Sequence, residues 1–213
     1  MANRAYQYLL NQFRDAEFGG VYWSVDYLGN PLNTRKQIYG QAFAIYGLSE
    51  YYKITQHKPA LDWAIELFEL IEKYSFDQVY GGYLEALSND WQSIEDLKLS
   101  QKDANEKKSM NTHLHIMEAY ANLFGVWKNQ LLSDQLKGII KIFLGYIVDS
   151  KTGHQQLFFD NNWEVKSKVI SYGHDIEASW LIHEAAEILG NEDLLQETQK
   201  LALKITDSVK IRI

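Results

Sequence analysis

The order of hydrophobic and polar residues along the chain predicts a mostly helical protein. Residues 59–74 place apolar side chains on one helical face and charged side chains on the other, the spacing of a helix at a protein surface. Residues 38–54 are apolar on nearly every side, which favours a helix covered by protein on several sides. Just before this helix, Thr34 and Gln37 fit a capping box, in which both side chains satisfy free backbone N–H groups.

The same two helix types alternate along the whole chain. Amphipathic helices are predicted near 2–15, 59–74, 131–149 and 192–210, and more apolar helices near 37–54, 109–128 and 173–190. Aromatic loops precede the apolar helices, with the degenerate sequences FGGVYW (18–23), YGGYLE (80–85) and QLFFD (156–160).

The spacing of these features indicates internal repeats. Gly19 and Gly81 are 62 positions apart, and His113 and His174 are 61 apart, the period of one helical hairpin with a long loop. Hairpins stacked in this way form an α/α toroid or a solenoid. In a toroid, the apolar helices line a central cavity and the long loops gather binding residues at one rim.

Composition and charge exclude several classes of function. The 213 residues are 46% hydrophobic and 14% aromatic, enough to bury one large core. The formal net charge of -7 arises from scattered acidic residues and provides no basic surface for nucleic acid or an anionic membrane. The chain has no cysteine, no run of about 18 apolar residues and no signal-peptide core at its start. We therefore expect a cytoplasmic protein without nucleic-acid or membrane partners.

Two histidines and an asparagine stand at the start of the second apolar helix, in the stretch KSMNTHLHIMEAY (108–120). Residues two apart in a helix point about 200° away from each other, so only one of His113 and His115 can face the cavity. Asn111, His115 and Glu118 share one face of this helix, whereas His113 lies on another.

The third apolar helix opens in a similar way, because SYGHDIE (171–177) places His174 and Glu177 at i and i+3. A neutral histidine can exchange a proton near pH 7, and a nearby glutamate can fix its tautomer or raise its basicity. Zinc also accepts two histidines and a carboxylate, which His115, His174 and Glu177 contain, but the spacing lacks the H-E-x-x-H signature. The pattern therefore favours acid–base chemistry over a metal site.

The remaining histidines have simpler interpretations. His57 lies in a polar turn before Pro59 and is typical of a solvated loop residue. His154 follows a glycine in a loop and is expected to be exposed. His113 and His183 are more typical of hydrogen-bonded or packed helix residues.

Longer stretches of the chain resemble a known family. GGVYWSVDYLGNP (19–31), QAFAIYGLSEYY (41–52), KSMNTHLHIMEAY (108–120) and SYGHDIEASWLIHEAAEILG (171–190) are similar to cellobiose 2-epimerases of the N-acylglucosamine 2-epimerase superfamily. The resemblance implies an (α/α)6 barrel that inverts C2 of the reducing-end glucose of a β-1,4-disaccharide without a cofactor. A base removes the C2 proton of the ring-opened sugar, a cis-enediolate forms, and an acid returns a proton to the other face.

The resemblance also implies roles for particular residues. His174 becomes an acid/base histidine, with Glu177 as its partner in proton transfer and ring opening. His115 and Asn111 become the groups that stabilise the enediolate, a task in which donors aimed at the oxyanion contribute about 3 kcal/mol each. Tyr39 becomes a weaker candidate for sugar binding, and Trp180 is expected to pack beneath the site. Aromatic residues of the loops suit either packing or stacking on sugar faces.

The chain departs from the family in its number of helices. A complete barrel needs about six hairpins, whereas one domain over 1–213 with about seven helices is an incomplete ring without the N-terminal and C-terminal hairpins. The family's arginine motif and second acid/base histidine have no counterpart, so this chain alone is expected to epimerise poorly. The alternative is a truncated, non-catalytic helical module with residual sugar binding. In either case, apolar end hairpins left in water at roughly 25 cal/mol per Å² predict self-association.

Overall fold

The structure is a computed structural model that describes residues 1–210; the last three residues of the predicted domain, 211–213, lie outside the described residues. Within residues 1–210 there are seven α-helices: α1 (Ala2–Tyr8), α2 (Ile38–Thr55), α3 (Lys58–Tyr74), α4 (Met110–Val126), α5 (Gln130–Ile142), α6 (Tyr172–Leu189) and α7 (Glu192–Lys210). Two π-helical turns, η1 (Leu9–Phe13) and η2 (Phe143–Ile147), extend α1 and α5. All seven predicted helices are confirmed, with ends that agree to within about two residues.

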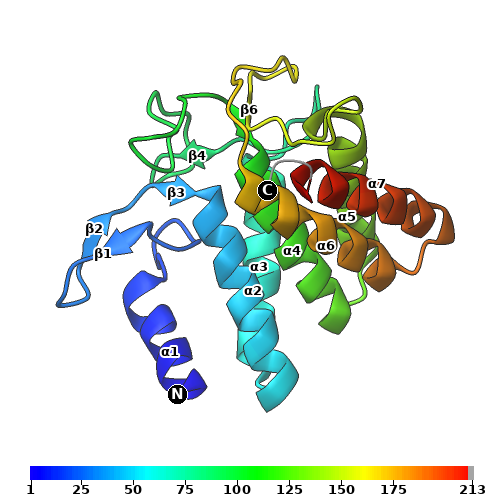
Figure 1. Cartoon of the computed structure of the whole chain (residues 1–213). Helices are drawn as coiled ribbons and strands as arrows, with labels where there is room; N and C mark the ends of the chain where they lie inside the picture. The colour runs from blue at the N-terminus through cyan, green and yellow to red at the C-terminus, as the bar shows by residue number, and fades with distance from the viewer. Residues whose placement is uncertain (211–213) are drawn as a thin grey trace.

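The helices form a row of inner helices with outer helices packed against it (Figure 1). Helix α4 packs between α2 and α6, while α1 and α3 pack on α2, α5 packs on α4 and α6, and α7 packs on α6. The apolar helices predicted near 37–54, 109–128 and 173–190 are these inner helices. The predicted alternation of outer and inner helices, and with it the α/α toroid architecture, is confirmed.

Burial explains the two helix types. Helix α4 buries twelve of its 17 residues because it has protein on both sides and behind it, so its sequence is apolar nearly all round. Helix α3 buries one stripe that includes Leu61, Leu67 and Phe68, and leaves Asp62 and Glu69 exposed. No helix within residues 1–210 is both long enough and apolar enough to cross a membrane.

Three short antiparallel strand pairs gather at the end of the molecule where α2 and α4 begin (Figure 1). They are β1 (Ser24–Val25) with β2 (Pro31–Asn33), β3 (Lys36–Gln37) with β4 (Ala86–Leu87), and β5 (Lys108–Ser109) with β6 (Phe158–Phe159). Strand β3 runs directly into α2 and β5 into α4, so the strand pairs fix where the first turns of these helices lie.

The capping box predicted for Thr34 and Gln37 is wrong. Gln37 itself is the N-cap of α2 and makes no capping bond, because it is held extended in β3 and its side-chain amide donates to Leu97 O at 3.4 Å. Helix α4 does have a side-chain cap, since Ser109 Oγ accepts the backbone N–H of Thr112 at 3.1 Å.

Each loop that leads back to an inner helix is built around an aspartate. Asp15, Asp77 and Asp149 each accept the backbone N–H groups two and three residues later, through one carboxylate oxygen. Each also donates its own N–H to the carbonyl five residues later, that of Gly20, Gly82 or His154. The third repeat therefore turns at 149–155, before the stretch 156–160 that the sequence suggested.

One side chain from each inner helix bonds to the residue that ends this turn. Gln41 donates to Val21 O and accepts Val21 N–H, both at 2.8 Å. His113 accepts Tyr83 N–H at 2.9 Å, and Asp175 accepts Gln155 N–H at 2.9 Å. His113 is therefore equivalent to Asp175, and the pairing of His113 with His174 inferred from spacing is wrong by one residue.

Two buried ion pairs join the loops to the starts of the inner helices. Lys36 Nζ lies 2.6 Å from Asp15 Oδ2, and Lys108 Nζ lies 2.8 Å from Asp77 Oδ2. Burial lowers the pKa of both lysines, although the aspartates oppose that effect. The rings of Trp91 and Trp163 lie 5.7 Å and 4.8 Å from the two ammonium groups. These contacts fix the rim against the helix starts that carry the predicted site residues.

Candidate active site

The five residues predicted to form the site lie in the first two turns of the three inner helices. Tyr39 belongs to α2, Asn111 and His115 to α4, and His174 and Glu177 to α6. Because α4 packs between α2 and α6, the three helix starts are neighbours at the rim end of the molecule. The structure therefore brings side chains from all three helices to one region.

His115 stands at the centre of this region. Its ring lies 5.0 Å from the ring of Tyr39 in an edge-on arrangement and 4.8 Å from the ring of Phe43, so α2 covers one side of it. His115 Nδ1 lies 2.9 Å from Glu118 Oε2, one turn further along α4. Only 7% of the residue is exposed. Glu118 thus fixes the ring and leaves Nε2 as the nitrogen available to a ligand.

Tyr39 packs against the histidine from α2. Burial raises the pKa of the half-buried Tyr39 phenol, and the negative charges of Glu177 and Glu118 raise it further. Trp23, from the first loop, lies edge-on to Tyr39 with ring centres 6.4 Å apart. Residues of α2, α4 and the first loop therefore meet around Tyr39.

His174 and Glu177 border an open hollow of about 570 Å³. His174 is half-buried, and its Nδ1 lies 2.7 Å from Ser171 Oγ, which leaves Nε2 as its other ring nitrogen. Trp180 lines the same hollow and is 53% exposed. The expectation that Trp180 packs beneath the site is therefore wrong, because its ring lies on the open face of α6.

Asn111 borders a second and much smaller cavity, of about 20 Å³, together with Glu85 and Ser109. Its side-chain oxygen Oδ1 is buried and has no hydrogen-bond partner among the described residues.

His113 is a core residue, as predicted. It is fully buried, with Nδ1 2.6 Å from Ser109 O and Nε2 accepting Tyr83 N–H. Since a carbonyl only accepts and an amide N–H only donates, the ring must carry its proton on Nδ1 and be neutral. Burial lowers the pKa of His113 to about 4, and the nearby Lys108 charge acts in the same direction.

The other histidines give a mixed outcome. His57 is exposed, as predicted. His154 was expected to be exposed, but it is buried, because Nδ1 lies 2.8 Å from the buried carboxylate of Asp175. His183 is partly packed, with Nδ1 buried and unpaired among the described residues.

The zinc alternative finds no support in the described part of the chain. No group of three or more histidine, aspartate or glutamate side chains within residues 1–210 is arranged to hold a metal ion. His115, His174 and Glu177 therefore do not form the cluster that this alternative requires.

Three residues of the region were not chosen from the sequence: Phe43, Ser171 and Glu85. Phe43 follows Gln41 by two positions, as His115 follows His113 and Glu177 follows Asp175. The bonding repeat thus places Phe43, His115 and Glu177 at equivalent positions of the three inner helices. Correct alignment of the repeats would have found Phe43, whereas Ser171 and Glu85 have no equivalent signal.

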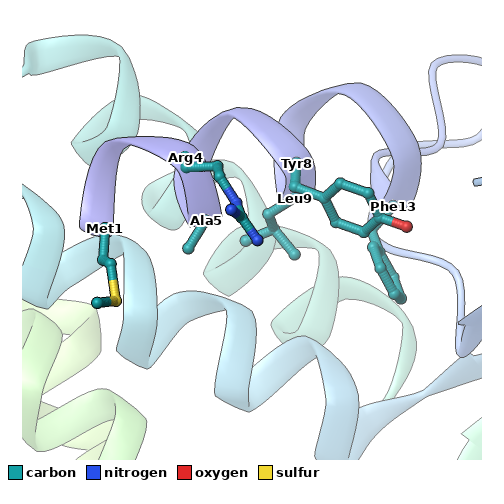
Figure 2. A pocket seen from close by; sticks show the side chains of 6 residues that line it. All are labelled: Met1, Arg4, Ala5, Tyr8, Leu9 and Phe13. Carbon is teal, nitrogen blue, oxygen red and sulfur yellow. The ribbon is translucent and has the colours of Figure 1, made fainter.

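A different hollow, of about 610 Å³, lies on α1 and η1. Figure 2 shows its lining side chains projecting from one helical segment: Met1, Arg4, Ala5, Tyr8, Leu9 and Phe13. This surface carries apolar groups and one arginine but no histidine or carboxylate. It suits contact with another apolar surface and not acid–base chemistry.

Comparison with known proteins shows the family of this chain. The family model for N-acylglucosamine 2-epimerase (GlcNAc 2-epimerase) matches residues 1–210. The cellobiose 2-epimerase of Bacteroides fragilis is 56% identical over 205 residues, which is 96% of this chain and 52% of that protein. That of Dictyoglomus turgidum is 44% identical over 98% of this chain and 53% of its own length.

Solved structures give the same result. The structure of cellobiose 2-epimerase from Bacillus thermoamylovorans matches with a TM-score of 0.94 and 38% identity, over 99% of this chain and 54% of that chain. A D-mannose isomerase structure, at 22% identity and a TM-score of 0.78, shares the fold. The chain spans about half the length of the relatives that it matches.

Proposed function

Because this chain belongs to the N-acylglucosamine 2-epimerase family, we propose that it supplies about half of a sugar 2-epimerase active site for cellobiose-like β-1,4-disaccharides. The observation that carries the proposal is the contact of the His115 and Tyr39 rings from two inner helices, next to a third inner helix that carries His174 and Glu177. The cellobiose 2-epimerase structure from Bacillus thermoamylovorans, at 38% identity, aligns with 99% of this chain, which supports the choice of substrate.

In the proposed reaction His174 exchanges the proton on C2 of the ring-opened sugar. With Nδ1 held by Ser171, Nε2 removes the C2 proton. The electron pair of the C–H bond forms the C1–C2 double bond, and the π pair of the C1 carbonyl moves onto its oxygen, which gives a cis-enediolate. Return of a proton to the opposite face of C2 inverts the centre. Glu177, three residues along α6 on the same hollow, serves proton transfer and ring opening.

His115 stabilises the enediolate in this scheme. When protonated it donates to Glu118 through Nδ1–H and presents Nε2–H to the oxyanion, and the Glu118 carboxylate balances its charge. Asn111 binds the sugar by donating to the enediolate oxygens together with His115, and Tyr39 binds a sugar hydroxyl. The exposed faces of Phe43 and Trp180 offer surfaces on which sugar rings can stack.

The chain supplies one proton-transfer histidine, and inversion requires a second acid on the other face of C2. We propose that this group comes from the part of the ring that the relatives have in addition to the matched half. This chain alone is then expected to exchange the C2 proton more readily than it inverts C2.

The alternative function is a non-catalytic helical module that binds sugar. The open hollow beside His174, bounded by residues of one helix, favours it, because water is not excluded there.

Proton exchange in D2O separates the two functions. The purified chain is incubated with cellobiose in D2O, and NMR follows deuterium at C2 of the reducing sugar and the formation of glucosylmannose. The enzyme function predicts exchange at C2 that His174→Asn abolishes and that His57→Ala, a change at an exposed histidine away from the site, leaves intact. Binding of cellobiose without exchange at C2 favours the module. The absence of both binding and exchange contradicts both functions.

A further inference from the structure

Glu85 is a buried carboxylate that the proposed reaction does not use. The residue is only 5% exposed and lies immediately before β4. Its backbone N–H donates to Lys107 O at 3.1 Å, and its carbonyl accepts the N–H of Ile38 at 3.0 Å. Glu85 therefore sits between the start of α2 and the strand that leads into α4.

The two oxygens of this carboxylate have different surroundings. Oε2 accepts the Thr112 hydroxyl at 2.9 Å, whereas Oε1 is buried and has no hydrogen-bond partner among the described residues. Burial raises the pKa of Glu85 to about 7, and the hydrogen bond from Thr112 opposes this effect. An unpaired buried oxygen of this kind destabilises the folded state unless something in the cavity bonds to it.

A second unpaired oxygen borders the same space. Asn111 Oδ1 is also buried without a partner among the described residues, and both side chains line the cavity of about 20 Å³. A cavity of this size holds one water molecule, which needs about 10–15 Å³, and excludes a sugar. Water carries two hydrogens, which matches two acceptors that have no other donor.

We infer that Glu85 is a positioning residue for Asn111: a single water in this cavity donates to Glu85 Oε1 and to Asn111 Oδ1, and so fixes the orientation of the Asn111 amide. Since the oxygen and nitrogen of an amide lie on opposite sides, holding Oδ1 in the cavity directs Nδ2–H2 away from it. That the amide then meets a sugar oxygen rests on the proposed function, whereas the link between Glu85 and Asn111 does not.

The link has a consequence when Glu85 gains a proton. Protonated Oε1 donates to the water, which turns to accept from Glu85 while it still donates to Asn111. The other charged groups that line the cavity are Lys98 and Asp103. The signals of the Asn111 side-chain NH2 group should therefore follow the titration of Glu85.

NMR of the labelled chain tests this link without any substrate. The Asn111 NH2 signals are assigned by their loss in Asn111→Asp and are followed from about pH 5.5 to about pH 8.5. We expect them to shift with a midpoint near the Glu85 pKa of about 7. Glu85→Gln, which cannot titrate, should abolish the shift, and the control Glu72→Gln at another buried carboxylate should leave it unchanged. Asn111 signals that stay constant, or that titrate equally in Glu85→Gln, would overturn the inference.

Cellobiose binding tests the consequence for the sugar. Glu85→Gln keeps a polar group toward the water and is expected to bind cellobiose within about twofold of the unchanged chain, whereas Glu85→Leu should bind about tenfold more weakly. Equal binding by both variants contradicts a positioning role. If the unchanged chain binds no cellobiose, the proposed function fails, and the Asn111 signals still decide the role of Glu85.

Discussion

Replacement of His113 by glutamine should make the stability of this protein less sensitive to acid. His113 bonds to Ser109 O and to the N–H of Tyr83, and in the first repeat Gln41 bonds to Val21 in the same position. A glutamine side chain can thus serve this position, and it does not titrate.

The size of the effect follows from the pKa of His113, which is about 4 in the folded protein against 6.5 for a free histidine. When folding lowers the pKa of a base, the free energy of unfolding is highest above the unfolded pKa. It then falls as the pH drops from the unfolded pKa toward the folded pKa. One pKa unit corresponds to about 1.4 kcal/mol, so His113 accounts for about 2 kcal/mol of lost stability between pH 7 and pH 5. The loss reaches about 3 kcal/mol near pH 4.

Urea denaturation at pH 7 and at pH 5 measures this contribution as a difference between two proteins. The carboxylates titrate in both, so the fall in the free energy of unfolding should be about 2 kcal/mol smaller in His113→Gln. His113→Ala is the contrasting variant, because it leaves Tyr83 N–H and Ser109 O unpaired and should lose about 3 kcal/mol at pH 7. If the free energy of unfolding fell as much between pH 7 and pH 5 in His113→Gln as in the unchanged protein, the conclusion that His113 is neutral and buried would be refuted.

Other predictions concern the rim and the outer surface. Gly82→Ala should lower the free energy of unfolding in urea by about 2–4 kcal/mol, because φ is +78° and a Cβ would lie 2.4 Å from Trp163. Gly81→Ala, where φ is +69° and the Cβ would point into open space, should lower it by only about 1 kcal/mol. Lys108→Met should lose about 3 kcal/mol by the same measurement because it leaves the Asp77 carboxylate without its cation, whereas breaking the exposed Lys58–Asp62 pair should change little. The apolar hollow on α1 predicts concentration-dependent association in sedimentation velocity, which Tyr8→Glu should weaken; a monomer at every concentration would contradict it.

The candidate site combines residues whose supporting contacts differ in range. His115 is oriented by Glu118 one turn away, and His174 by Ser171 at the N-cap of the same helix. Tyr39, by contrast, is held by contacts with His115 of α4 and with Trp23 of the first loop. Local sequence therefore fixes each imidazole, and helix packing decides which groups act together.

The sequence by itself determined the helices and their order. The hydrophobic periodicity predicts that α3 is buried on one side and α4 on most sides. The inner and outer helices could therefore be distinguished from the sequence. The separation of His113 from His115 also followed from the helical repeat alone, and the buried, bonded state of His113 agrees with it.

Only the tertiary structure decided the register of the repeats and the contacts between them. The third repeat turns at Asp149 without a pair of glycines, so spacing alone matched His113 to His174. The hydrogen bond of His113 to Tyr83 N–H corresponds to that of Asp175 to Gln155 N–H, so His113 is equivalent to Asp175. His154 looked like an exposed loop residue because its partner, Asp175, lies 21 positions away. Glu85 and Asn111 line one cavity together with residues of β5, β6 and a long loop. Such contacts depend on distances between segments far apart in the chain, which periodicity does not encode.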